Sequence, residues 1–314
     1  EKIVSNVSQS FKVLYLGGPR QVGKTTVLQH IAGHQSRSYV SLDNPQQRQL
    51  AQQDPELFLD RNPAPVLIDE VQYAPQLFPY IKIRVDQSAT PGQYWLTGSQ
   101  QFAVMQHVQE SLAGRVGILH LLGLSSAEMH RTVAPAEPFI PQPILDYPPT
   151  PTSEVDVFER IYRGSFPALW QDQAMTGDIF YNSYLQTYID RDLTALFGVT
   201  KLREFHTFLQ LCAARTGQLL NYSDLARDAG ISVNAARSWI SILEGTMQIY
   251  LLQPYYKNIS KRLIKTPKLY FLDTGFAAYL TKWNSAATLA TGAMAGAFFE
   301  THVVAELVKS YLFR

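Results

Sequence analysis

The chain has 314 residues, of which 46% are hydrophobic and 17% charged, so it can form packed cores and is not a wholly disordered protein. Its 27 basic and 26 acidic side chains leave a formal net charge of +1, which by itself selects no partner. A single cysteine, Cys212, excludes a disulfide framework and a cysteine-based zinc site, and no apolar run reaches the roughly 18 residues that cross a bilayer.

No signal peptide is visible, and a reducing compartment fits the low cysteine content. We therefore expect a cytoplasmic protein without a membrane partner, with about two domains of ordinary size. The chain opens with Glu1-Lys2 and ends within THVVAELVKSYLFR, a pattern typical of a helix that continues toward a strand. This pattern predicts a fragment of a longer protein.

Short apolar runs bounded by turn residues alternate with helical stretches in the first part of the chain. Strands are predicted at 11–16, 38–42, 65–69, 93–97 and 117–122, and helices at 24–32, 46–59 and 100–113. This alternation indicates βαβ units around a parallel sheet that is covered on both faces. The expected fold class is α/β.

The first predicted strand runs into a segment, GPRQVGKT, that matches the phosphate-loop pattern G-x-x-x-x-G-K-[ST]. Glycines let backbone N–H groups approach phosphates, and the N-terminus of the following helix attracts anions. Lys24 would supply a cation to the phosphates and Thr25 a hydroxyl to Mg²⁺. The candidate nucleotide-binding residues are Gly18, Pro19, Arg20, Gln21, Val22, Gly23, Lys24, Thr25 and Thr26.

Two carboxylates follow the apolar strand VLI at 66–68. Asp69 is the candidate for holding Mg²⁺ through water, and Glu70 the candidate general base for the attacking water. A strand that simply ends in solvated charge is the alternative. One strand fits between the loop and this pair in the sequence, so we expect another strand to separate the two in the sheet. No N-K-x-D guanine-reading motif is present, which favours adenine.

Further candidates lie at the end of the next strand and before the last one. The strand YWL ends in TGSQ at 97–100, and Thr97 or Ser99 would lie beside the γ-phosphate and the attacking water. An ordinary strand-to-helix turn is equally compatible. Arg115 could reach the γ-phosphate of a neighbouring copy as an arginine finger, which requires an oligomer, or could cap its own helix.

Seven prolines in residues 132–153 predict a linker or extended loop, and the pattern beyond it is helical at 154–163, 178–197 and 201–214. A short helix at 223–228, a turn at Gly230 and an N-cap at Ser232 then indicate a helix-turn-helix.

The second helix of that pair should bury Val233, Ala236, Ile240 and Leu243. Apolar runs at 249–252 and 268–272 could form the hairpin of a winged helix, with Tyr250, Tyr255, Tyr256, Tyr270 and Phe271 in its core. The candidate DNA contacts, chiefly to the phosphate backbone, are Arg237, Lys257, Lys261, Arg262, Lys265 and Lys268. Packing or regulatory use of this module is the alternative.

Together these segments resemble an AAA+ ATPase, and more closely the prokaryotic family of predicted AAA+ superfamily ATPases. The residues that carry the resemblance are GGPRQVGKTT, VLIDEVQ, LTGSQ and SLAGR, followed by YLQTYIDRDL, NYSDLARDAGISVNAARSWISILE, KRLIKTPKLYFLDTG and FFETHVVAEL. The resemblance implies ATP and Mg²⁺ as ligands. By this resemblance, Lys24 would bind phosphate and Thr25 and Asp69 the metal. Glu70 would be the general base, and Arg115 a possible arginine finger.

The resemblance also implies a domain order. An ATPase domain at 1–131 is expected to be followed by the linker at 132–153, a helical lid at 154–216, a winged-helix-like domain at 217–275 and the start of a nuclease-like domain at 276–314. Glu300 would fall on the first helix of that last domain. In the lid, Pro167 resembles the proline with which related ATPases contact adenine, and a helix-ending turn is the favoured alternative.

Two functions remain open at this point. The first is an oligomeric ATPase that binds ATP and ADP and couples hydrolysis to work on duplex DNA through the winged helix. The second is an ATP-dependent switch whose winged helix contacts protein. The basic tract favours the first function, whereas the near-neutral charge and the single arginine on the recognition helix favour the second.

Overall fold

The computed structural model describes residues 1–98, 110–131, 139–140, 153–172, 174–189, 201–255 and 265–312. These residues form two compact units that divide between Leu122 and Gly123. The division lies before residue 131, where sequence reasoning ends the first domain. The reason is that the short helix α7 (Ser126–Met129) is bonded to the second unit, where the backbone N–H of Ser126 donates to Glu306 at 2.8 Å.

Five parallel strands form the sheet of the first unit in the order β2-β3-β4-β1-β5. They are β1 (Val13–Gly17), β2 (Ser38–Ser41), β3 (Val66–Asp69), β4 (Tyr94–Thr97) and β5 (Val116–His120). All five predicted strands are therefore present, and the prediction of a parallel α/β sheet is confirmed. β4 lies between β1 and β3, so the phosphate-loop strand and the strand that ends in Asp69 are not neighbours.

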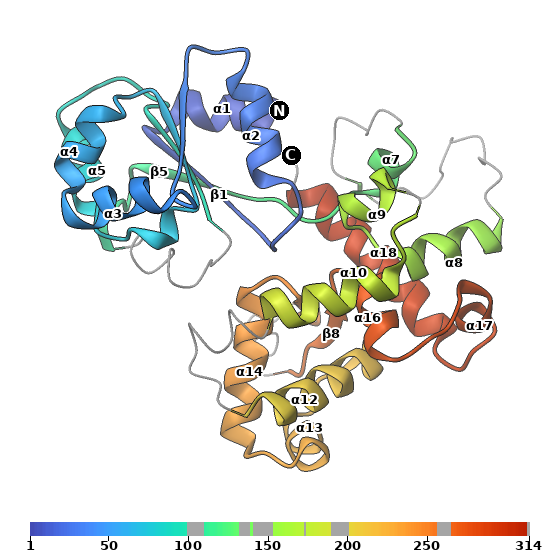
Figure 1. Ribbon diagram of the computed structural model, residues 1–314. Coiled ribbons are helices and arrows are strands. Elements are labelled where there is room, and N and C mark those ends of the chain that lie inside the picture. The colour runs from blue at the N-terminus through green and yellow to red at the C-terminus, as the bar shows by residue number, and fades with distance from the viewer. Residues whose placement is uncertain are drawn as a thin grey trace. The chain divides into compact units, whose positions relative to one another are not determined.

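Helices cover both faces of this sheet, as Figure 1 shows. The helices of the first unit include α1 (Lys2–Ser10), α2 (Lys24–Ala32), α3 (Pro45–Gln53), α4 (Pro55–Arg61) and α5 (Leu77–Asp86), with a 3-10 turn η1 (Val71–Tyr73). On one face α1 and α2 pack on Leu14, Leu67 and Trp95. On the other face α3, α4 and α5 pack on Tyr15, Ile68 and Leu96. Burial on both faces explains why the strands are almost continuously apolar.

One predicted helix is two helices in the structure. The stretch expected at 46–59 divides between α3 and α4, because Pro55 lacks the N–H that a continuous helix needs. The side chain of Asp54 caps the new helix by accepting from the N–H of Leu57 at 3.0 Å. The helix expected at 100–113 falls largely outside the described residues, as does most of the predicted linker.

The second unit is mostly helical. Its described elements beyond α7 are α8 (Glu154–Arg163), α9 (Pro167–Gln171), α10 (Gly177–Tyr184), a π-helical turn η2 (Leu185–Ile189), α12 (Leu202–Ala214), β6 (Gln218–Leu219), α13 (Tyr222–Ala229), α14 (Val233–Gly245), β7 (Ile249–Leu252), β8 (Lys268–Phe271), α16 (Thr274–Leu280), α17 (Ala286–Ala290) and α18 (Ala295–Leu312). Strands β6, β8 and β7 pair antiparallel in that order, and α18 packs against β8 and α8.

The pair α13 and α14 has the expected helix-turn-helix boundaries. Gly230 ends α13 with a φ of 67°, which favours glycine, and the hydroxyl of Ser232 caps α14 by accepting from the N–H of Ala235 at 3.1 Å. The buried face of α14 includes Ala236, Ile240 and Leu243 as predicted. Val233 is exposed instead, because it is the first residue of the helix and precedes the turn that packs.

The aromatic tract of the hairpin is only partly core. Tyr270 and Phe271 on β8 are buried as predicted, and Tyr250 is half-buried. Tyr255 is 80% exposed, so the prediction that it lies in the core is wrong. Its position beyond the end of β7 explains the difference, because the chain has left the sheet there. Tyr256 lies outside the described residues.

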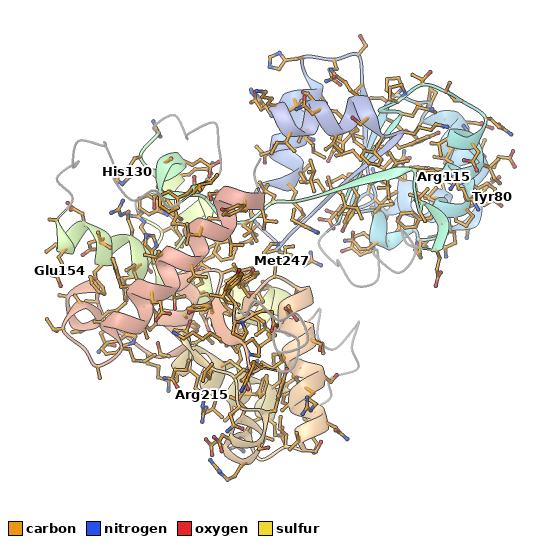
Figure 2. The ribbon with its side chains drawn as sticks, turned by 180° about the vertical axis from the view of Figure 1, so that it is seen from behind. Tyr80, Arg115, His130, Glu154, Arg215 and Met247 are labelled. Atoms are coloured by element: carbon orange, nitrogen blue, oxygen red, sulfur yellow. The ribbon has the colours of Figure 1, made fainter. Side chains whose placement is uncertain are left out.

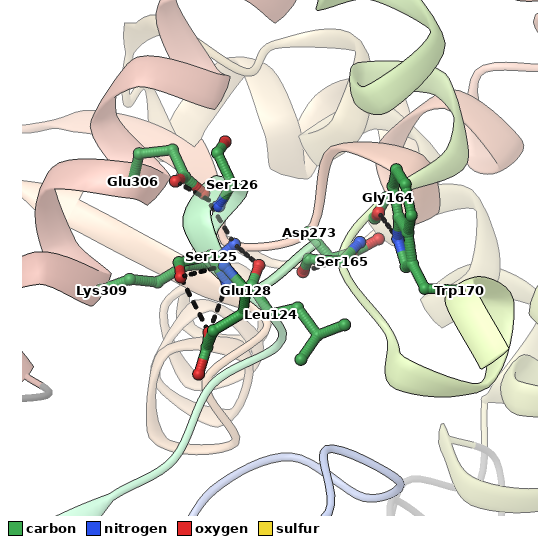
Figure 3. Close-up of polar contacts among 10 residues, drawn as sticks. All are labelled: Leu124, Ser125, Ser126, Glu128, Gly164, Ser165, Trp170, Asp273, Glu306 and Lys309. Carbon is green, nitrogen blue, oxygen red and sulfur yellow. Dashed lines mark hydrogen bonds and ion pairs between the residues drawn. The ribbon is translucent and has the colours of Figure 1, made fainter. Parts of the chain in front are cut away.

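The chain enters the second unit through a short segment, Leu121–Ser126, which we call the connector. The N–H of Leu121 donates to Gly17 at 2.9 Å, so the connector starts as an extension of β5 beside β1. Further along, the N–H of Leu124 donates to Ser165 at 2.7 Å, and its carbonyl accepts from the buried ammonium of Lys309 at 2.8 Å (Figure 3). The connector is thus fixed at both of its ends.

Among the helices of the described part of the chain, none is long and apolar enough to cross a membrane.

Candidate nucleotide-binding site

The loop between β1 and α2 has a backbone that only glycine can adopt at two positions. Gly18 has a φ of 143°, and a Cβ there would lie 2.0 Å from the carbonyl oxygen of Leu121. Gly23 has a φ of 93° and stands at the N-cap of α2. The first glycine therefore allows the loop to pass against the connector, and the second lets the helix begin directly beneath the loop. These are the two glycines of the predicted phosphate-loop pattern.

Lys24 lies at the first position of α2 and is buried. Its ammonium donates to two carbonyl oxygens of the loop, that of Gly18 at 3.1 Å and that of Pro19 at 2.7 Å. The loop therefore curls around a cation at the N-terminus of a helix. Backbone N–H groups and an ammonium in this arrangement attract a phosphate group.

Asp69, the last residue of β3, is 5% exposed and accepts hydrogen bonds on both carboxylate oxygens. The Thr25 hydroxyl donates to Oδ1 at 2.8 Å, and the Thr97 hydroxyl donates to the same oxygen. The Tyr39 hydroxyl donates to Oδ2 at 3.2 Å. The structure thus brings together Thr25 and Asp69, the two residues predicted to hold a metal ion, although they are far apart in the sequence.

Glu70 adopts the left-handed backbone conformation, with a φ of 56°. This conformation is costly for a residue with a side chain and is found preferentially at functional sites. The N–H of Glu70 donates to the Thr97 hydroxyl at 3.3 Å, and the amide of Gln72 donates to the Glu70 carboxylate. Burial raises the pKa of Tyr15 on the neighbouring strand β1, and the charge of Glu70 raises it further.

Residues 10–130 match the family model of an AAA domain. This match and the sheet order show an α/β domain with the fold of P-loop nucleoside triphosphatases. Residues 154–287 match the model of a domain of unknown function, DUF8612.

Two curated relatives are similar to nearly the whole chain. The uncharacterized proteins Rv2008c of Mycobacterium tuberculosis and Mb2031c of Mycobacterium bovis are each 28% identical to it over 301 residues, which are 94% of this chain. The chain spans 62% of the length of these relatives.

Among solved structures, the chain is similar to the Walker-type ATPase PABY2304 of Pyrococcus abyssi. The two are 14% identical, the match covers 89% of this chain and 93% of the other, and the TM-score is 0.48. The RuvB Holliday junction branch migration motor of Thermotoga maritima is 15% identical, covers 83% of this chain and 92% of its own, and has a TM-score of 0.32.

The donors in the AAA domain suit Mg²⁺. This ion prefers oxygen ligands and is usually bound by one or two protein groups together with waters and substrate phosphates. Thr25 and Asp69 present such oxygens next to the loop that curls around Lys24. In the described part of the chain, no three His, Cys, Asp or Glu side chains form a group that could hold a metal on their own. The residues present therefore fit a metal ion held jointly with a nucleotide.

Two predicted positions have different relations to this site. Thr97 is fully buried and contacts both Asp69 and the Glu70 backbone, as described above, whereas Ser99 lies outside the described residues. Arg115 directly precedes β5, whose first residue pairs with Val13, while the phosphate loop follows the other end of β1. Arg115 is therefore at the opposite edge of the sheet from the loop of its own chain.

Arg115 forms a two-pronged ion pair with Asp86 at the end of α5, with one N–O distance of 3.0 Å. Figure 2 shows its place in the first unit. The hydrogen bonds from Arg115 lower the pKa of the Asp86 carboxyl, which is solvent-exposed. This pair orients the guanidinium without burying it.

Pro167 begins α9 in the second unit, after a turn that is tied to the start of α16. Asp273 accepts hydrogen bonds from the N–H and hydroxyl of Ser165 at 2.6 and 2.7 Å, and from the Tyr181 hydroxyl at 2.7 Å. Figure 3 shows this turn next to the connector. The structure thus gives the turn before Pro167 a role within the second unit, and an adenine contact by Pro167 stays a prediction.

The basic residues assigned to DNA are partly engaged elsewhere. The ammonium of Lys268 pairs with Glu300 at 2.8 Å, and the hydrogen bond from Lys268 is the main cause of the lowered pKa of Glu300. The Arg237 guanidinium lies over the ring of Tyr222, 4.5 Å from its centroid, and Lys265 is exposed. Three further residues lie outside the described residues: Lys257, Lys261 and Arg262.

Sequence reasoning missed Tyr39 and His120. Tyr39 contacts Asp69 only because β2 pairs with β3, and no sequence motif marks it. His120 pairs with Gly17 at the start of the phosphate loop, and burial lowers its pKa. Placing Tyr39 and His120 near the site requires the order of the strands in the sheet, which a single sequence does not give.

Proposed function

We propose that the AAA domain binds ATP together with Mg²⁺ and hydrolyses it. The observation that carries this proposal is the meeting of Thr25, Asp69 and Thr97 beside the loop that curls around Lys24. A bound Mg²⁺ would supply positive charge to neutralise the phosphate oxygens during phosphoryl transfer.

Each of the protein's own residues has a distinct role in this proposal. Lys24 exchanges its bonds to the loop carbonyls for bonds to phosphate oxygens, and Thr25 and Asp69 hold the metal, Asp69 through water. Glu70 accepts the proton of the attacking water as general base, and Thr97 fixes the distance between the two carboxylate-bearing residues. Residues 18–26 form the binding loop, and the missing guanine-reading motif favours adenine.

The direct experiment is phosphate release from ATP by the purified chain, with Mg²⁺ or with a chelator and with GTP as competitor. Hydrolysis that requires Mg²⁺ and resists GTP supports the proposal. Hydrolysis that persists in the chelator, or no nucleotide binding at all, contradicts it.

We further propose that Arg115 acts in an oligomer, on the nucleotide of a neighbouring copy. Its place at the sheet edge away from its own loop, with a guanidinium that is oriented but not buried, supports this role. The expected result is association of the Glu70→Gln variant in Mg²⁺-ATP, measured by analytical ultracentrifugation. The Arg115→Ala variant should bind ATP with unchanged affinity and turn over more slowly. A species that stays monomeric at every concentration contradicts the finger.

For the second unit we propose a helical lid and a winged-helix-like domain. The element order α12-β6-α13-α14-β7-β8, with a helix-turn-helix before an antiparallel hairpin, supports the latter. The winged helix would couple ATP hydrolysis to work on DNA, through its hairpin and mostly through phosphates. We also propose that residues 276–314 begin a nuclease-like domain. The proposed location of the protein is the cytoplasm.

The alternative is a switch whose winged helix contacts protein. It is favoured by the pairing of Lys268 with Glu300, which offsets one positive charge, and by the stacking of Arg237 on Tyr222, which restrains the guanidinium.

A salt series separates these two functions. Each phosphate contact releases condensed counterions, so the logarithm of affinity falls with the logarithm of salt, by about 0.9 per phosphate neutralised. Changing Lys261 and Arg262 together to alanine should flatten this slope by roughly two units, with little dependence on DNA sequence. Fluorescence anisotropy with labelled duplex DNA measures the slope.

The matched control removes the same charge from the first unit, by changing the exposed Lys2 and Arg61 to alanine. This control should keep the wild-type slope. If wild type shows no salt-dependent DNA binding, while the Lys261 and Arg262 variant alters the ATPase rate, the protein-binding switch is favoured.

A further inference from the structure

Tyr39 lies on the edge strand β2, on the face of the sheet that α2 covers. The register pairs Tyr39 with Leu67 and Ser41 with Asp69. Tyr39 therefore lies on the same face as Asp69, two residues earlier in the register. The ring is 45% exposed, whereas Asp69 is 5% exposed. The phenol therefore reaches a buried carboxylate from the solvent side, and its hydroxyl donates to Oδ2 at 3.2 Å.

The three hydroxyls on Asp69 divide between its two oxygens. Thr25 and Thr97 share Oδ1, and Tyr39 donates to Oδ2. In the proposed function Thr25 turns to the metal, which leaves Thr97 and Tyr39 to fix the carboxylate. A carboxylate held on both oxygens cannot rotate freely, and such outer contacts orient the groups that hold a metal.

We propose that Tyr39 is a positioning residue for the metal site, acting through Oδ2 of Asp69. This inference rests on the proposed function, because it concerns the same site. It predicts a specific loss: without the hydroxyl, the carboxylate is free to rotate and Mg²⁺ binds more weakly, while the phosphate loop is unchanged.

The test compares Tyr39→Phe with wild type in two binding measurements. A fluorescent ATP analogue is titrated in a chelator, and Mg²⁺ is then titrated at fixed analogue; Mn²⁺ binding followed by electron paramagnetic resonance gives a readout independent of turnover. We expect the Mg²⁺ concentration for half-maximal effect to rise about tenfold, the lower end of the range for an outer-shell contact. The affinity for the ATP analogue measured in the chelator should not change.

The matched control is Tyr80→Phe. Tyr80 is also a partly exposed tyrosine of the first unit, but it lies on α5, which covers the opposite face of the sheet (Figure 2). Asp69→Asn supplies the second control, because a residue that acts through Asp69 should have no further effect once that carboxylate is gone. Tyr39→Phe should therefore leave the Mn²⁺ affinity of the Asp69→Asn variant unchanged.

The outcomes distinguish this inference from the proposed function. If wild type shows no Mg²⁺ effect, the proposed function fails before Tyr39 is tested. If wild type responds to Mg²⁺ but Tyr39→Phe behaves as Tyr80→Phe does, the positioning role is overturned. The role is also overturned if Tyr39→Phe weakens binding of the ATP analogue equally with and without metal. It is overturned as well if Tyr39→Phe lowers the Mn²⁺ affinity of the Asp69→Asn variant by the full factor seen in wild type.

Discussion

Replacing Lys24 by alanine is expected to lower affinity for Mg²⁺-ATP by ~100-fold or more. The ammonium is the side-chain cation inside the loop, where it now contacts the carbonyls of Gly18 and Pro19. Hydrogen bonds to charged groups contribute about 1.5–3 kcal/mol each, so losing two of them to phosphate oxygens accounts for a loss of this size. Isothermal titration calorimetry with ATP and Mg²⁺ measures it.

The fold of this variant should survive, because alanine is a strong helix former at the first position of α2. Thermal unfolding checks this point, and Lys2→Ala, an exposed lysine on α1, is the matched control. Wild-type affinity in the Lys24 variant would show that the loop does not bind the phosphates.

The Glu70→Gln variant is expected to bind ATP normally and to turn over at least ~100-fold more slowly, the lower value for a positioned general base. Glutamine keeps the shape of the side chain and its place after β3, and Asp69, the proposed metal-binding residue, is left unchanged. Single-turnover phosphate release, together with equilibrium ATP binding, separates the chemical step from binding.

Glu56→Gln is the control for this experiment, since Glu56 is an acid in the first turn of α4 with no part in the site. An unchanged rate in Glu70→Gln would place the base elsewhere. Asp43 is then the next residue to change, because it follows β2 at the same edge of the sheet, where the N–H of Leu42 donates to the backbone carbonyl of Asp69.

The sheet and its loop could be predicted from the sequence because their signals are local. Buried parallel strands are short apolar runs, and the helix at 24–32 has the predicted bounds in the structure. Thr97 lies on the face of β4 opposite to Tyr94 and Leu96, which is the face of Asp69. Alternation alone does not separate Thr97 from Ser99, because residues two positions apart on a strand share a face.

Other elements could not be predicted because their cause is tertiary or their signal is ambiguous. The helix α5 escaped prediction because Pro79 lies inside it, although proline is tolerated in a first turn. The contacts of Tyr39 with Asp69 and of Lys268 with Glu300 depend on strand pairing and helix packing.

The close contact between Gly18 and the carbonyl of Leu121 has a mechanical consequence. The strand β5, which pairs with the phosphate-loop strand β1, continues as the connector. The next anchored residue, Leu124, has both backbone groups occupied, by Ser165 and Lys309. Gly123 has no room for a side chain against Ser165. A side chain at either glycine would therefore force the connector backbone to move, at Gly18 against Leu121 and at Gly123 against Ser165.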